Sequence, residues 1–511
     1  MQHQYLIGID IGTSGCKSVI VNELGKIISE AYYEYGMSTS EPGWCEQDPE
    51  DWWRAVKITV GRLLKDFPSV QSIKGIGLCG QMHGMVLLDS KGDVIRPCIL
   101  WCDQRNEKQC QDIQERVGGV AGLLKLTSNK MLTGYTGGKI LWTMENEPAN
   151  FEKTRIILNP KDYIRFRLTG EYATEVSDAS GTGLFDVKNR KWSDELLSIL
   201  GISKELLPSC YESIEISGRL SNNAAEELKL PYGLPVVGGG GDAIVQSIGS
   251  GLVKSGVMGA TIGTGGQVTA NLDSCCNNPE GKLQIFCNVI PGKWHAMGVM
   301  LTAGGAFKWL KNLLYEDMKE IDSRTGNVFE MMDKKAENVP VGSERLFFLP
   351  YLNGERCPHN DPYARGAFVG LNLRHKKPHL IRSVLEGVAF GLRDLSEVIM
   401  ELGITPKRIY ASGGGANSNL WRQIIAEILN MDVYTMNTAA FGGAYGAALL
   451  AGVGTNTWAS VEEAAMVMKV KTKNHPENEN TVKYNSLFPI YKQLYGSLKE
   501  DFRKISKIAE V

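Results

Sequence analysis

Two glycine-rich segments, far apart in the chain, share one pattern. Residues 6–21 read LIGIDIGTSGCKSVIV, and residues 257–271 read VMGATIGTGGQVTAN. Each passes from an apolar run through Ile-Gly-Thr to a small residue and a glycine, and then returns toward apolar residues. The pattern predicts a β-hairpin whose turn offers backbone N–H groups and a Thr hydroxyl to an anion. Single Gly-Thr turns are common, but a matched pair predicts two related halves that bind one nucleotide.

Length and composition indicate a two-domain globular protein. The chain has 511 residues, of which 43% are hydrophobic and 22% are charged. A formal net charge of −2 argues against nucleic acid or an anionic membrane surface as the main ligand. We expect neither a signal peptide nor a membrane span, because no window approaches 18 uninterrupted apolar residues. Eleven cysteines without paired CxxC sets predict no zinc site and no disulfide framework, and favour a cytoplasmic location.

Short β-rich runs alternate with helical patterns, which predicts α/β domains. We place the boundary near residue 250, which gives an N-terminal domain at 1–250 and a C-terminal domain at 251–511. Residues 234–251, LPVVGGGGDAIVQSIGSG, predict a strand, a four-glycine turn and the start of a helix. The Ala- and Gly-rich residues 441–452 predict a close-packed helix, and the polar residues 471–480 predict a surface loop.

Asp10 is the first candidate for a functional acid. Strand alternation places it on the opposite face from Ile9 and Ile11. A carboxylate beside a phosphate-binding turn repels phosphate unless a cation lies between them, and Mg²⁺ suits such a site. The alternative is an Asp that only caps the turn.

Asp242 follows the four glycines at 238–241 and opens a predicted helix. The helix N-terminus favours a carboxylate at this position, so a plain capping residue is the alternative. Because glycine has no side chain, we expect the run to leave one wall of the site open, so that a ligand can reach the carboxylate. An acid at this position can act as the general base when a phosphoryl group is transferred to a hydroxyl. Phosphoryl transfer otherwise depends on the positioning of the reactants and on neutralisation of the phosphate charge.

A polyol site is predicted where two polar motifs follow one another. Residues 80–84 read GQMHG at the end of a predicted strand, and residues 100–105 read LWCDQR. A lone His is more often structural than a ligand, and Trp101 is either a stacking surface for a sugar or a core residue. A Ser-His-Asp triad is disfavoured because no nucleophile-elbow motif is present. The candidate polar residues are Gln81, His83, Asp103 and Arg105.

A third glycine turn lies in residues 412–423, SGGGANSNLWRQ. Its glycines and Asn417 suit the ribose and base of a nucleotide at a strand-to-helix turn. The dinucleotide fingerprint GxGxxG is not met because Ser418 stands where its last glycine belongs, and no Walker P-loop is present.

These residues together resemble the FGGY family of carbohydrate kinases, within the actin-like ATPase superfamily. Residues 134–146, GYTGGKILWTMEN, resemble the first family signature, with Thr143 where an aliphatic residue is usual. Residues 366–386, GAFVGLNLRHKKPHLIRSVLE, resemble the second. The resemblance extends from Tyr5 to about Gly452. It implies an α/β fold of two RNase H-like domains flanking a deep cleft, with ATP as co-substrate and Mg²⁺.

Within the family, GQMHG and WCDQR are most similar to the xylulokinases. This implies ATP-dependent phosphorylation of D-xylulose to D-xylulose 5-phosphate. By resemblance, Met82 and His83 line the sugar site, Asp242 is the catalytic base and Asp10 is the metal-associated acid. The implied ATP contacts are Gly12, Thr13, Ser14, Thr264, Gly265, Gly304, Lys308, Gly414 and Asn417.

Two departures from the xylulokinase pattern leave the exact sugar open. Ala243 stands after the catalytic Asp where Asn is common, and Cys102 stands where Asn is frequent. The alternatives are a family member acting on another pentulose, a polyol or gluconate, a non-catalytic actin-like protein that binds sugar or nucleotide, and a dinucleotide-dependent dehydrogenase. Dimers are common in the family, so a homodimer is an expectation from resemblance alone.

Overall fold

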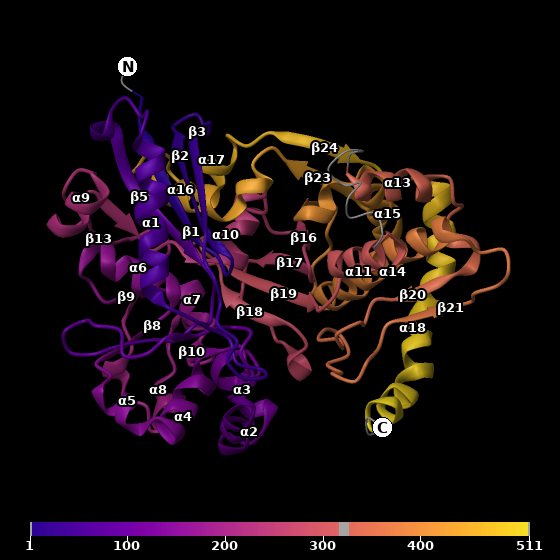
Figure 1. The fold of residues 1–511 in the computed structure, drawn as a ribbon, viewed down its shortest axis with the longest axis horizontal. Coiled ribbons are helices and arrows are strands. Elements are labelled where there is room, and N and C mark those ends of the chain that lie inside the picture. Colours follow the sequence, from indigo (N-terminus) through magenta and orange to yellow (C-terminus); the bar gives the residue numbers. More distant parts are fainter. Residues whose placement is uncertain (1–2, 316–326, 509–511) are drawn as a thin grey trace. The chain divides into compact units, whose positions relative to one another are not determined.

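The computed structural model describes residues 3–315 and 327–508, and the chain divides into two compact units (Figure 1). The first unit comprises Met1–Ser255, Asn271–His295 and Phe441–Lys469, and the second comprises Gly256–Ala270, Ala296–Ala440 and Val470–Val511. The boundary expected near residue 250 lies close to the first passage of the chain from one unit to the other, at residue 255. The later return of residues 441–469 to the first unit was not expected from the sequence.

The first unit is built on a mixed sheet. In sheet order its strands are β13 (Ile216–Arg219), β14 (Pro235–Val237), β5 (Ile73–Gly80), β1 (Tyr5–Ile11), β2 (Gly15–Asn22) and β3 (Ile27–Glu34), and β15 (Gly240–Gly241) also pairs with β5. β1, β2 and β3 form an antiparallel meander, whereas β5 runs parallel to β1, β14 and β15. The hairpin predicted at residues 6–21 is confirmed as β1 and β2, with Ile11 opposite Cys16.

Helices and short two-stranded ribbons complete this unit. Its helices are α1 (Pro49–Leu64), α2 (Glu107–Arg116), α3 (Val120–Thr127), α4 (Thr136–Asn146), α5 (Pro148–Lys153), α6 (Pro160–Thr169), α7 (Val176–Ser180), α8 (Asp194–Leu200), α9 (Asn222–Leu228), α10 (Asp242–Gly249), α16 (Gly442–Gly454) and α17 (Val461–Ala465). The ribbons are β4 (Glu46–Gln47) with β7 (Cys98–Ile99), β6 (Val86–Leu88) with β8 (Ile156–Leu158), β9 (Ala173–Glu175) with β12 (Ser209–Tyr211), and β10 (Phe185–Asp186) with β11 (Lys191–Trp192). Residues 284–287 form β18 (Gln284–Cys287).

The two faces of β1 pack against different helices. Ile7, Ile9 and Ile11 enter the core that contains the tryptophans of α1. Gly8 lies on the other face, where a methyl group in place of its hydrogen would overlap the carbonyl oxygen of Ala444 in α16. A methyl group at Gly77 of β5 would likewise overlap the backbone of the next turn of α16. This backbone-to-backbone packing confirms the close-packed helix expected at 441–452 and explains why it belongs to the first unit.

The second unit contains a second sheet, in which β19 (Trp294–Met300), β17 (Gly266–Leu272), β16 (Met258–Ile262), β22 (Arg408–Ser412), β23 (Asp432–Met436) and β24 (Val470–Asn474) follow one another. The hairpin predicted at 257–271 is confirmed as β16 and β17, with Ile262 opposite Gly266. The helices of this unit are α11 (Gly304–Tyr315), α13 (Val328–Glu337), α14 (Lys377–Met400), α15 (Asn419–Leu429) and α18 (Asn478–Ser506), and β20 (Phe347–Leu349) pairs with β21 (Ala367–Val369).

The loop predicted at 471–480 is wrong at both ends, because β24 occupies residues 470–474 and pairs antiparallel with β23, and α18 begins at Asn478; only residues 475–477 lie outside these elements. β24 is an edge strand whose side chains are mostly exposed, so it carries no apolar alternation that a sequence pattern could reveal. Its backbone pairing with β23 and the hydroxyl contact of Thr435 with Thr472, at 2.6 Å, hold it in place.

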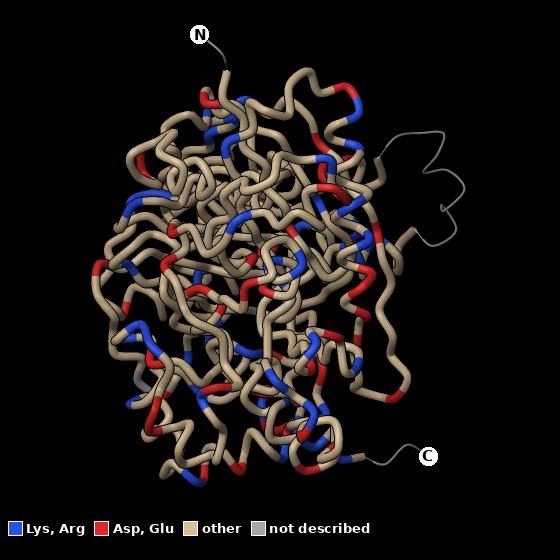
Figure 2. Tube along the Cα trace, turned by 90° about the vertical axis from the view of Figure 1, so that its left-hand side faces the viewer, with Lys and Arg blue, Asp and Glu red and all other residues tan. Residues whose placement is uncertain are grey.

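Charged residues of both signs are interspersed along the trace (Figure 2). All eleven cysteines lie in described parts of the chain, and each is a free thiol there. None of the helices within residues 3–315 and 327–508 is long and apolar enough to cross a membrane.

Candidate active site

The register of the first sheet brings Asp10 and Asp242 to the same edge. Asp10 of β1 and Gly240 of β15 both pair with Cys79 of β5. Ile11 and Gly241 both pair with the next residue, and Asp242 follows directly. Because β1, β5 and β15 are parallel, their carboxyl ends meet at one edge, where open α/β sheets bind their ligands.

Asp10 lies on the α16 face of β1, where Gly443 leaves room for its carboxylate. A methyl group at Gly443 would overlap Oδ2 of Asp10. Oδ1 is buried and has no hydrogen-bond partner among the described residues. Burial raises the pKa of Asp10, while a hydrogen bond with Cys79 and the charge of Lys17 lower it. A buried carboxylate oxygen without a donor fits a hard cation.

The protein itself offers few further ligands for such a cation. No group of three or more His, Cys, Asp or Glu side chains that could hold a metal occurs within residues 3–315 and 327–508. Mg²⁺ is commonly bound through one or two carboxylates together with water and phosphate oxygens, so a single carboxylate such as Asp10 is compatible with it.

Asp242 is the first residue of α10, after Gly241 at the N-cap. Its Oδ1 accepts a hydrogen bond from the backbone N–H of Ala243 at 2.7 Å. Burial and, next, the charge of Asp10 raise the pKa of Asp242 to about 7. A carboxylate with a pKa near neutrality is suited to take up a proton from an alcohol during a reaction.

The four glycines before Asp242 do not leave space for a ligand, contrary to the expectation from the sequence. A methyl group at Gly238 or Gly239 would overlap backbone of the protein, at the carbonyl oxygens of Glu212 and Leu78 respectively. One at Gly241 would lie 2.6 Å from Cγ of Met82. The glycines let neighbouring backbone and the buried Met82 approach the strand closely, and Gly239 also adopts a φ of +69°.

His83 is held in an uncommon backbone conformation by α4. Its φ is +70°, which a residue with a Cβ rarely adopts. The ring Nδ1 lies 2.7 Å from the carbonyl oxygen of Gly181. The carbonyl oxygen of His83 accepts hydrogen bonds from Nζ of Lys139 at 2.8 Å and from the hydroxyl of Thr136 at 3.1 Å. Burial lowers the pKa of Lys139 to about 8.

Lys139 and Thr136 were not among the residues predicted from the sequence. Both lie in the segment 134–146 that carries the first family signature, which was the available signal. They support the sugar-binding candidate His83 through its backbone.

A chain of hydrogen bonds joins the first hairpin turn to the predicted sugar loop. The hydroxyl of Thr13 donates to Oε1 of Gln81 at 3.1 Å and accepts from the indole N–H of Trp101 at 3.0 Å. Nε2 of Gln81 donates to Gln47, which in turn donates to the carbonyl oxygen of Thr13 at 2.7 Å. Gln81 is buried, so it positions the turn, whereas Trp101 is 43% exposed and is not a core residue.

Gly12 and Ser14 flank Thr13 in the same turn, where the N–H of Gly12 donates to the carbonyl oxygen of Gly15 at 3.0 Å. Asp103 is fully buried. Its carboxylate accepts from the forked guanidinium of Arg105 and from the N–H of Cys45 at 2.7 Å. Asp103 therefore orders the loop at 100–105 within the protein.

In the second unit, a cavity of about 800 Å³ gathers most of the predicted nucleotide contacts. Its lining includes Thr264, Gly304, Lys308, Gly414 and Asn417, whereas Gly265 lies in the same turn but not in the lining. Ile262, Phe307, Phe329 and Trp421 add apolar surface suited to a nucleotide base.

The first turn of α11 is hydrogen-bonded to the hairpin turn beside this cavity. The N–H of Gly304 donates to the carbonyl oxygen of Gly263 at 2.8 Å, and the N–H of Gly305 donates to that of Thr264 at 2.9 Å. A side chain at Gly304 would displace the turn, since its Cβ would lie 2.5 Å from the carbonyl oxygen of Gly263. Glycine at this position therefore allows the turn and the helix to form one wall of the cavity.

Comparison with known proteins assigns the chain to a family. Residues 5–249 match the model of the N-terminal domain of the FGGY family of carbohydrate kinases, and residues 258–455 match that of its C-terminal domain. The chain belongs to the FGGY family of carbohydrate kinases. Its two-unit α/β fold is the fold of this family, as the resemblance implied, and FGGY kinases phosphorylate a small-molecule sugar with ATP as co-substrate.

Individual relatives of this FGGY kinase include enzymes with two different substrates in their names. The xylulose kinase of Escherichia coli (strain K12) is 36% identical over 492 residues, which cover 96% of this chain and 99% of the relative. The gluconokinase of Bacillus subtilis (strain 168) is 30% identical over 505 residues, with 98% of both chains covered. A crystal structure described as a xyloylose kinase from Brucella ovis has a TM-score of 0.90 at 33% identity and covers 97% of this chain and 100% of its own.

Proposed function

We propose that this FGGY kinase phosphorylates the terminal hydroxyl of D-xylulose and forms D-xylulose 5-phosphate, with Asp242 as the general base. The observation that carries the proposal is the placement of Asp242 beside Asp10 at the carboxyl edge of the first sheet, with its pKa raised to about 7. The 36% identity to a xylulose kinase over nearly the full chain supports the sugar.

In the proposed reaction, the carboxylate of Asp242 accepts the proton of the sugar hydroxyl while the hydroxyl oxygen bonds to the γ-phosphorus. The bond from that phosphorus to the bridging oxygen of ADP breaks, and ADP leaves. Met82 and His83 orient the sugar, and Asp10 is the residue that would hold Mg²⁺. Bound Mg²⁺ would offset the negative charge on the phosphate oxygens.

The identity of the sugar is tested by a substrate panel with ATP and Mg²⁺ in an ADP-release assay. We expect D-xylulose to give the highest kcat/KM among pentuloses, polyols and aldonates. The gluconokinase relative makes gluconate the second candidate. An aldonate carboxylate calls for a cationic partner, and the GQMHG loop contains no Lys or Arg. A higher kcat/KM with gluconate than with D-xylulose would overturn the assignment of the sugar.

The nucleotide cavity is tested at Lys308, the residue of α11 that lines it with a cationic side chain. We expect Lys308→Ala to raise the KM for ATP by about tenfold, the usual scale for loss of a charge-assisted hydrogen bond to phosphate. The KM for D-xylulose should stay unchanged. The control is Lys407→Ala, because Lys407 is exposed and lies outside the cavity lining. Equal KM values for ATP in both variants would remove Lys308 from the site.

A further inference from the structure

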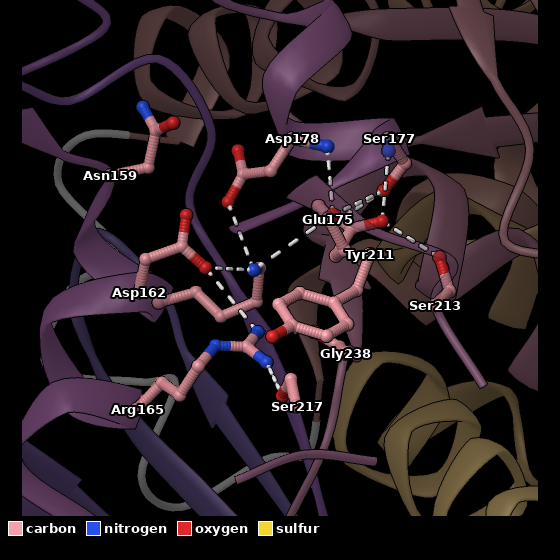
Figure 3. A network of polar contacts seen from close by, with 12 residues as sticks. Asn159, Asp162, Arg165, Glu175, Ser177, Asp178, Tyr211, Ser213, Ser217 and Gly238 are labelled. Atoms are coloured by element: carbon pink, nitrogen blue, oxygen red, sulfur yellow. Dashed lines mark hydrogen bonds and ion pairs between the residues drawn. The ribbon is translucent and has the colours of Figure 1, made fainter. Parts of the chain in front are cut away.

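A group of five fully buried charged side chains lies in the first unit (Figure 3). The buried charge cluster consists of Lys161, Asp162, Arg165, Glu175 and Asp178. Nζ of Lys161 contacts Oδ1 of Asp162 and lies 3.6 Å from Asp178 and 3.8 Å from Glu175. Three carboxylates therefore share two cations away from water. Buried charges lower the stability of a protein unless they are paired with opposite charges, as Lys161 and Arg165 are here.

Glu175 of the cluster orients two serine hydroxyls. Its Oε1 accepts from the hydroxyl of Ser177 at 2.8 Å, and its Oε2 accepts from that of Ser213 at 2.7 Å. It also accepts from the backbone N–H groups of Ser177 and Asp178, both at 2.8 Å. In the bond between the two side chains the hydroxyl of Ser177 is the donor and the carboxylate oxygen is the acceptor, so the hydroxyl proton of Ser177 points toward Glu175.

The hydroxyl oxygen of Ser177 then accepts a hydrogen bond from the backbone N–H of Gly241, at 3.0 Å. Gly241 is the N-cap of α10 and directly precedes Asp242. Ser213 makes the same kind of bond to Glu175, but its hydroxyl has no bond to the glycine run; only its backbone carbonyl does, accepting from the N–H of Gly239 at 2.8 Å.

Arg165 forms hydrogen bonds at the other end of the same glycine run. Its guanidinium donates to the carbonyl oxygens of Gly238 and, at 3.2 Å, of Val237. Arg165 of the cluster therefore bonds the run at its first glycine, Ser177 bonds it at its last, and β5 pairs with its last two glycines. This arrangement leaves little freedom for the backbone that carries Asp242.

We propose that Ser177 is a positioning residue of the kinase: its hydroxyl, oriented by Glu175 of the buried charge cluster, fixes the N–H of Gly241 and thereby the carboxylate of Asp242. The inference rests on the proposed function, because it takes Asp242 as the general base. Small displacements of a catalytic group lower the rate of the chemical step more than they lower substrate affinity.

The test compares Ser177→Ala with Ser213→Ala in the full chain. Each variant loses one hydroxyl bond to Glu175, and only Ser177→Ala also loses the bond to Gly241. We expect Ser177→Ala to lower kcat by about ten- to a hundredfold with KM for D-xylulose unchanged. Ser213→Ala should keep the kcat of the unmodified enzyme, and both should show similar Tm values. Equal kcat values in the two variants, or failure of Ser177→Ala alone to fold, would overturn the inference.

Asp242→Asn and the double variant Ser177→Ala, Asp242→Asn separate the two proposals. If Asp242 is the base and Ser177 acts through it, the serine substitution has little further effect in the Asp242→Asn background. A near-normal kcat in Asp242→Asn means that the base is assigned wrongly. A large loss in Asp242→Asn together with a near-normal kcat in Ser177→Ala leaves the base in place and removes Ser177 as its positioning residue.

Discussion

Asp242→Asn should lower kcat with D-xylulose by about 10²–10⁴-fold, the usual contribution of a general base. The amide has nearly the shape of the carboxylate but cannot take up the hydroxyl proton. Sugar affinity, measured by calorimetry, should remain close to that of the unmodified enzyme, because the GQMHG loop is unchanged. A kcat within about tenfold of the unmodified enzyme would contradict the assignment of the base.

The raised pKa of Asp242 predicts that both kcat/KM and the stability of the unmodified enzyme depend on pH. Below a pH of about 7 the carboxyl is protonated, so kcat/KM should fall with decreasing pH. The folded-state pKa lies above the unfolded one, so the contribution of Asp242 to stability is full at low pH and is lost as the pH rises toward 7. Asp242→Asn should therefore raise the Tm relative to the unmodified protein at about pH 8 and not at about pH 4.

Lys161→Met should lower the free energy of unfolding by about 3–5 kcal/mol, the scale for removing one partner of a buried ion pair. Lys161 is fully buried and faces three carboxylates. In the variant, Arg165 would be the one cation left in the cluster. Urea unfolding followed by tryptophan fluorescence measures the loss.

The matched control is Lys57→Met, which removes the surface pair of Lys57 with Glu227, where both side chains are 41% exposed. It should cost no more than about 1 kcal/mol. The loss in Lys161→Met should shrink as the pH falls, because burial already raises the pKa of Asp178 and Lys161 lowers it. Without Lys161 the carboxyl group of Asp178 favours the protonated form still more, so its stabilising contribution is present at low pH and lost at high pH. Equal losses in both variants would show that the cluster is not a buried ion network in solution.

Local sequence patterns were sufficient to predict the elements of this kinase that repeat or that depend only on residues close together in the chain. Ile-Gly-Thr between apolar runs identified both hairpins, since strand alternation and a glycine turn need only neighbouring residues. The Ala- and Gly-rich segment 441–452 identified a close-packed helix for the same reason. The polar edge strand β24 was missed because its pairing partner, and not its own composition, makes it a strand.

The placement of Asp242 after a run of glycines was readable from the chain, but the purpose of the glycines was not. Their Cβ positions are occupied by backbone, by Met82 and, at Gly240, by the side chains of Val245 and Val289, which only the folded sheet reveals. Asp103 looked like a ligand for a sugar, yet Arg105 and Cys45 engage its carboxylate in the buried loop.

The amino-acid order alone was enough to establish the α/β class, the two glycine hairpins and the candidate acids Asp10 and Asp242, because each depends on residues adjacent in the chain. Tertiary structure decided which charges are buried and what they hold. Lys161, Glu175 and Ser177 look like ordinary polar residues in the sequence, since nothing local marks a charge as buried. Only the pairing of β15 with β5 brings Gly241 to the hydroxyl of Ser177 and so sets the position of Asp242.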